Sequence, residues 1–400
     1  MIEIMIGTVA GVAIGMASGL LPGIHVNTMA GILLTFQAAL LPVLGPEMLA
    51  ATLFAALITH TFLDVVPSTF LGIPDPDTAV SVLPLHELCM EGKGEEAVRI
   101  SALGSAAGLL IAIPLSGALL LLLPAVQEYV DWGIGIILIG FMGYLIVSGE
   151  SPGWAFLVFC ASGMLGLFTF RFSFLGTGVI GTAGLLMPLL SGLFGIAILI
   201  FSGTGPVPPQ KFEGLELEKG AVLKHTLLGT VAGTVVGWLP GLSNATANAV
   251  LATGIRYEKD RRGYILATGA ANTMNALVAL AAFFVIGRTR NGIMVAFSSL
   301  EIPTMGTLVA VGALAGTIAY LLTIYMGGLA GYFSGIDRKN LHIAVCIFIA
   351  LISFVICGPF GLFILLLATA VGTAPRLVNV AQVYCMGAIA LPVIFFSFGL

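Results

Sequence analysis

The chain has 400 residues, of which 58% are hydrophobic and only 8% are charged, and its formal net charge is −4 at pH 7. Soluble domains usually carry about 25% charged residues, so this composition excludes a soluble globular protein. No basic stripe of the kind that binds nucleic acid is present, so we expect no nucleic-acid partner. The composition indicates a multi-pass protein of a lipid bilayer, expected in the cell (plasma) membrane.

Apolar runs separated by short polar breaks follow one another from residue 4 to residue 398. Most are about 17 to 25 residues long, which is enough to cross about 30 Å of hydrocarbon as a helix. The residue-by-residue alternation typical of an outer-membrane barrel does not occur. We therefore predict an all-α integral membrane protein, a polytopic helical transporter with broken or re-entrant helices. The polar connections are too short to form a soluble domain, so 1–400 is expected to be one membrane domain.

A motif near the N-terminus returns in the second half of the chain. Glycines at every fourth position precede a Pro-Gly pair in both copies: Gly11, Gly15, Gly19 and Pro22-Gly23, then Gly229, Gly233, Gly237 and Pro240-Gly241. Such glycines make a smooth stripe on one helix face, and doubled, broken helices are typical of transporter binding sites. We predict repeats over 5–110 and 222–333, joined by connecting spans over 111–221 and followed by C-terminal spans over 334–400.

The basic residues give an expectation for orientation. The loop 256–262 holds the densest basic cluster of the chain, so the positive-inside rule predicts that it is cytoplasmic. The loop 87–99, chosen as its counterpart in the first half, is rich in glutamate. This contrast suggests that the two loops lie on opposite sides of the membrane and that the repeats are inverted.

The Pro-Gly pairs predict a substrate site. Each pair ends a helix, and the helix that follows, near Thr28 or Thr246, begins with free N–H groups that favour a carboxylate or phosphate. The candidate substrate-binding residues are Pro22, Gly23, His25, Asn27 and Thr28 in the first copy and Pro240, Gly241, Ser243, Asn244 and Thr246 in the second. The alternative is that both pairs are ordinary kinks or turns between spans.

A second polar break follows in each half. The candidate ion-coupling residues of the first half are Asp64, inside an apolar span, and Gly72, Pro74, Asp75 and Asp77 at the break. Carboxylates beside freed carbonyls suit Na⁺ or a proton, unless this segment is a hydrated loop at the membrane surface.

The second half offers Arg288 and Arg290 at the corresponding break and Asn272 in the preceding span. The arginines are expected to bind an anionic substrate, to pair with Asp75 and Asp77, or to anchor the chain at the membrane surface. Asn272 lines a substrate path or joins helices by hydrogen bonds.

The sequence contains no enzyme signature and no nucleotide-binding motif in a suitable context. His60 and Asp64 could bind a metal, but a third ligand is not evident. We therefore expect no catalysis, no cofactor and no metal.

Four segments carry a family resemblance: GLLPGIHVNT (19–28), FLGIPDPDTAVSVLP (70–84), GWLPGLSNATANAVL (237–251) and GAANTMNA (269–276). Together they resemble the large membrane subunit of tripartite tricarboxylate transporters, the TctA-type permeases. The resemblance implies a secondary transporter for carboxylates that is driven by an ion gradient. It also implies a small membrane subunit and an extracytoplasmic binding protein as partners.

The sequence departs from that family in two places. Members typically have a Gly-Pro pair shortly after the first Pro-Gly, where this chain has His25-Val26. They also have a Gly-Ile-Pro-Gly-like break in the second half, where this chain has the segment 287–290. The chain therefore resembles a divergent member, and its substrate and its need for partner subunits stay open.

The predicted function is secondary active transport (symport) of a small organic anion, a di- or tricarboxylate, coupled to Na⁺ or H⁺. One alternative is a translocase for a polyprenyl-phosphate lipid carrier, which would need a lateral opening between spans. Another is a non-transporting scaffold subunit, for which the Thr28→Ala and Thr246→Ala variants would keep full activity.

Overall fold

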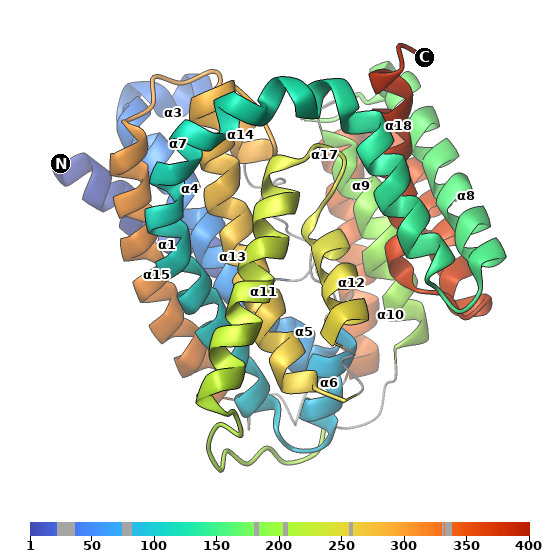
Figure 1. The fold of residues 1–400 in the computed structure, drawn as a ribbon, viewed down its shortest axis with the longest axis horizontal. Coiled ribbons are helices and arrows are strands. Elements are labelled where there is room, and N and C mark those ends of the chain that lie inside the picture. The colour runs from blue at the N-terminus through green and yellow to red at the C-terminus, as the bar shows by residue number, and fades with distance from the viewer. Residues whose placement is uncertain are drawn as a thin grey trace.

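The computed structural model describes residues 1–21, 37–73, 82–179, 184–202, 207–255, 259–329, 332 and 338–400. Over these ranges the chain forms helices and no strand (Figure 1). Seven of the described helical segments are long and apolar enough to cross a membrane: 2–20, 46–71, 94–147, 152–171, 261–286, 305–328 and 339–377. The predicted fold class, an all-α polytopic membrane protein, is confirmed.

In the first repeat, helix α1 (Ile2–Leu20) packs along α4 (Pro46–Leu63), with the short α3 (Gln37–Leu44) preceding α4. The glycine stripe forms this contact. A Cβ atom on Gly11 would lie 2.3 Å from the carbonyl oxygen of Thr52, and one on Gly15 would lie 2.5 Å from that of Ala56. The two helices therefore touch backbone to backbone and run in the same direction.

The second repeat uses the same contact. Helix α11 (Lys219–Trp238) packs along α13 (Arg261–Ile286), and α12 (Asn244–Ile255) connects them in sequence. A Cβ atom on Gly229 would lie 2.1 Å from the oxygen of Ala267, and one on Gly233 would lie 2.5 Å from that of Ala271. Ala267 and Ala271 stand 215 positions after Thr52 and Ala56, so the two helix pairs are built at equivalent positions.

The second helix of each pair also ends alike. After α4 the chain continues as α5 (Val65–Leu71), which ends at Gly72 with φ 65°, and α13 ends at Gly287 with φ 66°. These two positions are again 215 apart. Glycine adopts this left-handed conformation without a Cβ penalty, which explains its presence at both ends.

The two pairs run in opposite directions. In Figure 1, α4 descends from α3 at the top to α5 and α6 (Val82–Met90) at the bottom. By contrast, α13 rises from the bottom to α14 (Gly292–Phe297) at the top. We call these ends of the molecule the lower and the upper end. The two helices meet where the hydroxyls of Thr61 and Thr273 lie 3.1 Å apart. Opposite directions are the arrangement expected of inverted repeats.

One step of the orientation argument is wrong. Arg261 bonds Glu91 at 2.7 Å, so the loop 87–99 and the described part of the second loop, 259–262, lie together at the lower end instead of on opposite sides. The loops are not equivalent, because the chain reaches the first after α4 descends and the second after α12 descends (Figure 1). The support for inverted repeats is instead that α4 and α13 run in opposite directions. The bounds of the repeats and the cytoplasmic side stay predictions.

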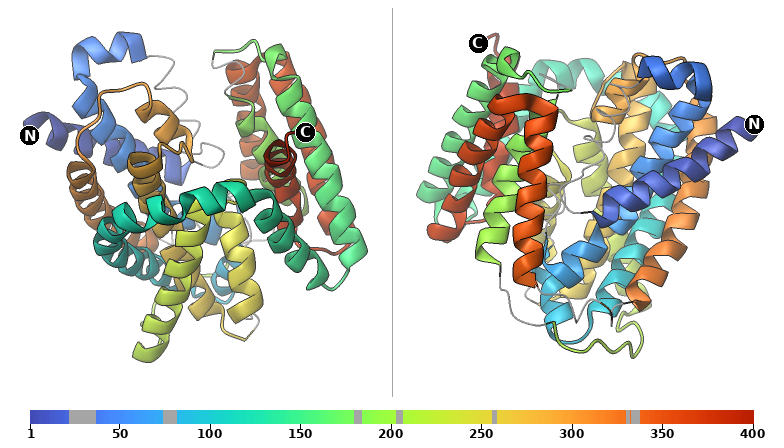
Figure 2. Two further views of the ribbon diagram at one scale, coloured as in Figure 1. Left: turned by 45° about the horizontal axis from the view of Figure 1, so that its top comes forward. Right: turned by 180° about the vertical axis from the view of Figure 1, so that it is seen from behind.

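A second bundle stands beside the repeat helices, as Figure 2 shows. Helix α7 (Gly94–Val147), with Pro114 and Pro124 inside it, rises in the first bundle, crosses the upper end and descends into the second (Figure 1). The second bundle continues with α8 (Pro152–Arg171), η1 (Ser173–Leu175), α9 (Leu186–Leu190), η3 (Ser191–Ile196), α10 (Ala197–Phe201), α17 (Arg338–Leu377), η4 (Gln382–Met386) and α18 (Gly387–Ser397). Helix α15 (Met305–Gly328) packs on α4 and α7 in the first bundle.

The glycine contacts predict a stability difference between chemically identical substitutions. We expect Gly233→Ala to lower the free energy of unfolding by about 1 to 3 kcal/mol, because α11 and α13 must move apart. Gly117→Ala on α7 meets nothing within 4 Å and should be neutral or stabilising by up to about 1 kcal/mol, since alanine favours helix. Thermal unfolding of the detergent-solubilised protein measures both. Equal midpoints for the two variants would contradict the close helix contact.

Candidate functional site

The Pro240-Gly241 pair ends α11 because proline lacks a backbone N–H and glycine turns the chain. The N–H of Leu239 still bonds the carbonyl of Val235 at 3.0 Å, but Pro240 has no N–H for the carbonyl of Val236. Gly241 then turns the chain with φ 78°. The break therefore leaves carbonyls at the end of α11 that need donors from elsewhere.

Arg288 and Arg290 supply those donors. Arg290 Nη2 donates to the carbonyl of Val236 and, at 2.9 Å, to that of Leu242, while Arg288 Nη1 donates to the carbonyl of Trp238 at 3.4 Å. Cations at the carbonyl end of a helix are favourable because that end carries partial negative charge. This role was not predicted, although a proline that frees a carbonyl was a visible signal that a donor is needed.

Arg288 also has an acidic partner. Its Nη2 forms an ion pair with Oδ1 of Asp131, where α7 crosses the upper end. The sequence had left open a pairing of the arginines with Asp75 and Asp77, and these two acids lie outside the described residues. The positive charge of Arg288 is thus held against α7 at the edge of the site.

The start of α12 is closed by a reciprocal cap. The N–H of Ser243 donates to Oγ1 of Thr246 at 3.2 Å, and the N–H of Thr246 donates to the carbonyl of Ser243 at 2.9 Å. Thr246 is fully buried, and its hydroxyl serves this cap. Asn244 is the first residue of α12 and carries the side chain that faces α13.

Asp64 stands at a helix break in the middle of the protein. It separates α4 from α5, where Pro67 has no N–H for the carbonyl of Leu63. Ser68 Oγ donates to the carbonyl of Asp64 at 3.0 Å. The Asp64 residue is only 4% exposed, so this carboxyl is held deep in the first bundle.

A chain of hydrogen bonds joins Asp64 to the start of α12. Asn272 Nδ2 on α13 donates to Asp64 Oδ2 at 2.8 Å, and Asn244 Nδ2 donates to Asn272 Oδ1. Asn244 Oδ1 is buried and has no hydrogen-bond partner within the described structure. We refer to these three residues as the Asn244–Asn272–Asp64 chain. It connects the Pro-Gly break of the second repeat to the helix break of the first.

These groups line a cavity of about 950 Å³ between the repeat helices and the second bundle. We call it the central cavity. From the first repeat it is lined by Leu57, His60, Thr61 and Asp64, and from α13 by Asn272, Asn275, Ala276 and Ala279. Each member of the second set stands 215 positions after its counterpart, so equivalent faces of α4 and α13 line the cavity. The backbone is therefore symmetric here, while the side chains differ.

The central cavity brings together most of the described candidates. Its lining includes Asp64, Pro240, Gly241, Ser243, Asn244, Asn272, Arg288 and Arg290. Thr246 and Gly72 do not line the cavity. Thr246 caps the start of α12, and Gly72 ends α5. The candidates Pro22, Gly23, His25, Asn27, Thr28, Pro74, Asp75 and Asp77 lie outside the described residues.

Other lining residues were not predicted. Asp131 comes from the part of α7 that follows the first predicted repeat, and Phe396 comes from α18, after the second. His60 also lines the cavity, and its Nδ1 lies 3.1 Å from Ser18 Oγ. In the part of the chain that the structure describes, no three His, Cys, Asp or Glu side chains group as metal ligands do.

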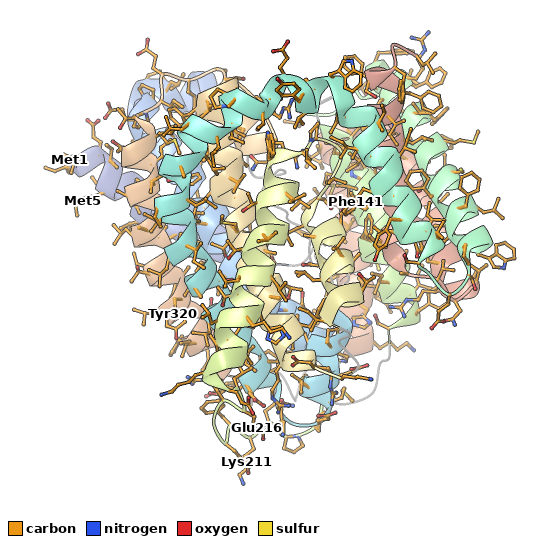
Figure 3. The ribbon with its side chains drawn as sticks, viewed as in Figure 1. Met1, Met5, Phe141, Lys211, Glu216 and Tyr320 are labelled. Carbon is orange, nitrogen blue, oxygen red and sulfur yellow. The ribbon has the colours of Figure 1, made fainter. Side chains whose placement is uncertain are left out.

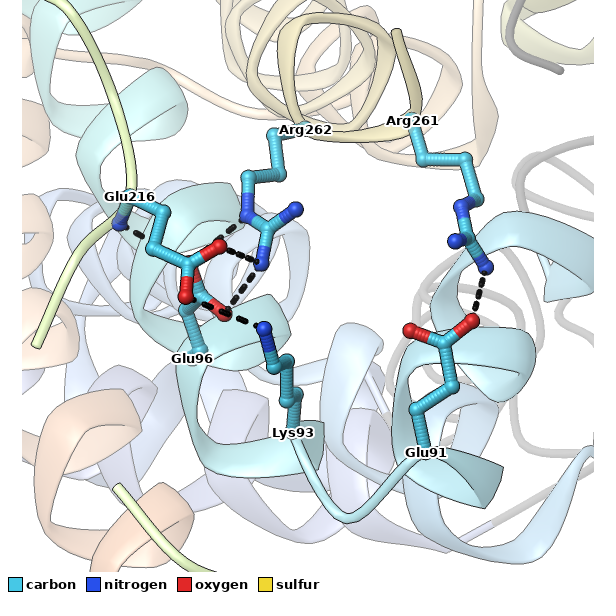
Figure 4. Close-up of polar contacts among 6 residues, drawn as sticks. All are labelled: Glu91, Lys93, Glu96, Glu216, Arg261 and Arg262. Carbon is cyan, nitrogen blue, oxygen red and sulfur yellow. Dashed lines mark hydrogen bonds and ion pairs between the residues drawn. The ribbon is translucent and has the colours of Figure 1, made fainter. Parts of the chain in front are cut away.

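The lower end is held by charges. Glu91, Lys93, Glu96, Glu216, Arg261 and Arg262 form the lower ionic cluster, shown in Figure 4. Arg262 bonds Glu96 at 2.8 Å and Glu216 at 2.6 Å, while Lys93 bonds Glu216 at 3.0 Å. The bond from Lys93 lowers the pKa of the Glu216 carboxyl below its usual 4.5, so it stays ionised. Glu216 and the nearby Lys211 mark the lowest part of the molecule in Figure 3.

Comparison with known proteins gives a family match over most of the chain. The model of the family described as "Tripartite tricarboxylate transporter TctA family" matches residues 5–387. An uncharacterized protein of Methanocaldococcus jannaschii, MJ1079, is 31% identical over 366 residues, which cover 89% of this chain and 88% of that protein. No solved structure matches the chain. Because the family match spans both repeats and the second bundle, the chain belongs to the tripartite tricarboxylate transporter TctA family, a family of transport proteins.

Proposed function

We propose that the protein is a secondary active transporter that carries a small organic anion, a di- or tricarboxylate, with Na⁺ or H⁺ as the coupling ion. One observation carries the proposal: the central cavity is lined by equivalent positions of two oppositely directed helix pairs and lies beside their breaks. Sites at the interface of inverted repeats, formed by discontinuous helices, are the general design of secondary transporters.

The lining supports an anionic substrate and a separate coupling group. Arg288 and Arg290 lie at the upper part of the cavity, and α12 begins there with Asn244, at a helix end that carries partial positive charge. Asp64 supplies a buried carboxyl to the same lining. An acid buried within a membrane span is a candidate for binding Na⁺ or a proton.

The two ends of the molecule differ in a way that suits alternating access. The lower ionic cluster joins α6, α7 and α13 beneath the cavity, whereas the cavity lining reaches residues 287–291 at the upper end. Basic residues gather at the lower end, which the positive-inside rule makes cytoplasmic. The cavity then extends toward the extracytoplasmic side. A binding protein delivering substrate there, with a small membrane subunit beside the helices, fits the tripartite assembly that the family's name describes.

Uptake by proteoliposomes tests this function. We expect radiolabelled citrate or succinate to accumulate when an inward Na⁺ or H⁺ gradient is imposed on vesicles that contain the purified protein. Arg288→Gln should reduce the initial rate at least about tenfold, because about 1.4 kcal/mol of electrostatic attraction corresponds to that factor. Arg376→Gln changes an exposed arginine in the last turn of α17, away from the cavity lining, and serves as the matched control. Uptake that responds to neither gradient would refute coupled transport.

A further inference from the structure

We propose that Asn244 and Asn272 form a relay that offers the transported anion an N–H donor only after Asp64 has bound a proton, which makes H⁺ the coupling ion. This inference rests on the proposed transport of an organic anion. The relay would make anion binding depend on whether Asp64 is protonated. It follows from the direction of the hydrogen bonds from Asn244 to Asn272 and from Asn272 to Asp64.

Donation runs one way along the Asn244–Asn272–Asp64 chain. Asn244 Nδ2 donates to Asn272 Oδ1, and Asn272 Nδ2 donates to Asp64 Oδ2 at 2.8 Å. An ionised carboxylate has no hydrogen to donate, so it requires Asn272 to turn its NH₂ group toward it. Asn272 must then turn its oxygen toward Asn244, and Asn244 is left with its own oxygen, Oδ1, as the free end. That oxygen is buried at the cavity and has no hydrogen-bond partner in the described chain.

This arrangement disfavours an anion. The free end of the relay is an acceptor, and a substrate carboxylate also only accepts, so no hydrogen bond forms between them. The charge of ionised Asp64 repels the substrate in the same cavity. Leaving a buried acceptor unpaired is itself unfavourable, which is a reason to expect a function for it.

Protonation of Asp64 reverses the relay. A protonated carboxyl donates its O–H, so Asn272 turns by a half rotation of its amide and accepts through Oδ1. Asn244 turns in the same way, so that Asn272 Nδ2 donates to Asn244 Oδ1 and Asn244 Nδ2 becomes the free end facing the cavity. The rotation gives up the weaker bond of 3.3 Å from Asn272 Nδ2 to the carbonyl of Thr61. The proton comes from water in the cavity and leaves when Asp64 is exposed to the other side, so one H⁺ moves with each anion.

The neighbours of Asp64 define the competing titrations. The charged and titratable side chains described on the elements around it are Glu3 on α1, Glu47 and His60 on α4, His86, Glu87 and Cys89 on α6, Glu95, Glu96, Arg99, Glu128, Tyr129, Asp131 and Tyr144 on α7, Arg261, Arg262 and Tyr264 on α13, Arg288 and Arg290 after α13, Tyr320 and Tyr325 on α15, and Lys339, His342, Cys346, Cys357 and Arg376 on α17. Among the described members of this set, His60, Asp131, Arg288 and Arg290 share the central cavity with Asp64. His60 is therefore the alternative source of a pH effect near neutrality.

Citrate binding between pH 6 and pH 8, measured by calorimetry on the purified protein without Na⁺, tests the relay. For the wild-type protein we expect the dissociation constant to rise about tenfold for each pH unit over which Asp64 loses its proton. Asp64→Asn supplies a permanent NH₂ donor in place of the acid. It should bind citrate with the low-pH affinity of the wild type at every pH. Citrate itself titrates in this range, so the two proteins are compared at the same pH, where its protonation is the same for both. Asp64→Asn should exchange external for internal citrate yet fail to accumulate it under a pH gradient.

Asn244→Ala separates the relay from a direct effect of Asp64. We expect binding about tenfold weaker than that of the wild type at pH 6, and a clearly smaller change of the dissociation constant with pH, because only the direct repulsion by ionised Asp64 remains. His60→Gln should retain the wild-type slope. The relay is refuted if Asn244→Ala keeps the wild-type pH dependence of binding, or if His60→Gln loses it. It is also refuted if wild-type binding needs Na⁺ and does not depend on pH. A wild-type protein that neither binds nor transports citrate or succinate at any pH refutes the transport function itself. If Asp64→Asn does not fold, Asn244→Ala alone decides between the outcomes.

Discussion

Asn272→Leu is expected to reduce citrate uptake at least about 100-fold while the protein still folds. Leucine is close to asparagine in size but removes both the donor to Asp64 and the acceptor for Asn244. A hydrogen bond to a charged group is worth about 1.5 to 3 kcal/mol, and about 3 kcal/mol corresponds to roughly a 100-fold change. The initial rate of uptake into proteoliposomes, normalised to the amount of reconstituted protein, measures the loss.

The matched control is Thr268→Val, one helical turn earlier on α13. Thr268 is also buried, but its hydroxyl bonds the carbonyl of Ile265 in its own helix at 2.9 Å and does not line the central cavity. We expect its uptake within about twofold of the wild type, because the loss of one local bond is worth about 1 kcal/mol or less. Near-normal uptake by Asn272→Leu would place the substrate path elsewhere in the protein.

Glu96→Ala is expected to lower the free energy of unfolding by about 3 kcal/mol, the effect of removing one partner of a buried ion pair. The Glu96 residue is only 3% exposed, and its two carboxylate oxygens accept from Arg262 at 2.8 and 2.9 Å. Oε1 also accepts the backbone N–H of Glu216 at 3.0 Å, so the loop before α11 loses an attachment as well. Thermal or denaturant unfolding in detergent measures the change.

The neighbouring glutamate provides the control. Glu95 pairs with Arg99 within the first turns of α7, and a pair at this spacing contributes about 0.5 kcal/mol, so Glu95→Ala should have a small effect. Adding Arg262→Leu to Glu96→Ala should recover part of the loss, because the uncompensated guanidinium is removed. Equal destabilisation by Glu95→Ala and Glu96→Ala would show that the lower ionic cluster does not hold this end together.

The repeat is the part of the architecture that the sequence revealed most directly. Glycines at every fourth position can only make a smooth face, and a Pro-Gly pair must end the helix, so both features are local and can be read without a structure. The structure places Gly11 and Gly233 against the backbones of α4 and α13, as such a stripe requires. The orientation argument failed because two loops rich in charge were taken as equivalents, whereas they face one another through Arg261 and Glu91.

The sequence predicted several residues of the candidate site but not the hydrogen bonds between them. Asp64 and Asn272 were chosen as polar residues within apolar spans, and Asn244 because it follows the Pro240-Gly241 pair. Nothing in the spacing of positions 64, 244 and 272 shows that they form one chain. Arg288 and Arg290 were interpreted as ligands for an anion, partners of acids or anchors at the membrane surface, and the structure adds that they donate to carbonyls at the end of α11. The lining contributed by α18 had no signal at all in the sequence.

Local physical chemistry explains this division. Composition, run length and Gly-Pro spacing act through solvation and backbone geometry within a few residues, so they determined by themselves that this chain is a helical membrane protein and predicted two matched breaks. The directions of α4 and α13, the meeting of Asp64 with Asn272, and the partners of both arginines depend on contacts between residues far apart in sequence. Only the packing of the two bundles decides those contacts, because each side chain is satisfied by whichever donor or acceptor the tertiary fold brings within hydrogen-bond distance.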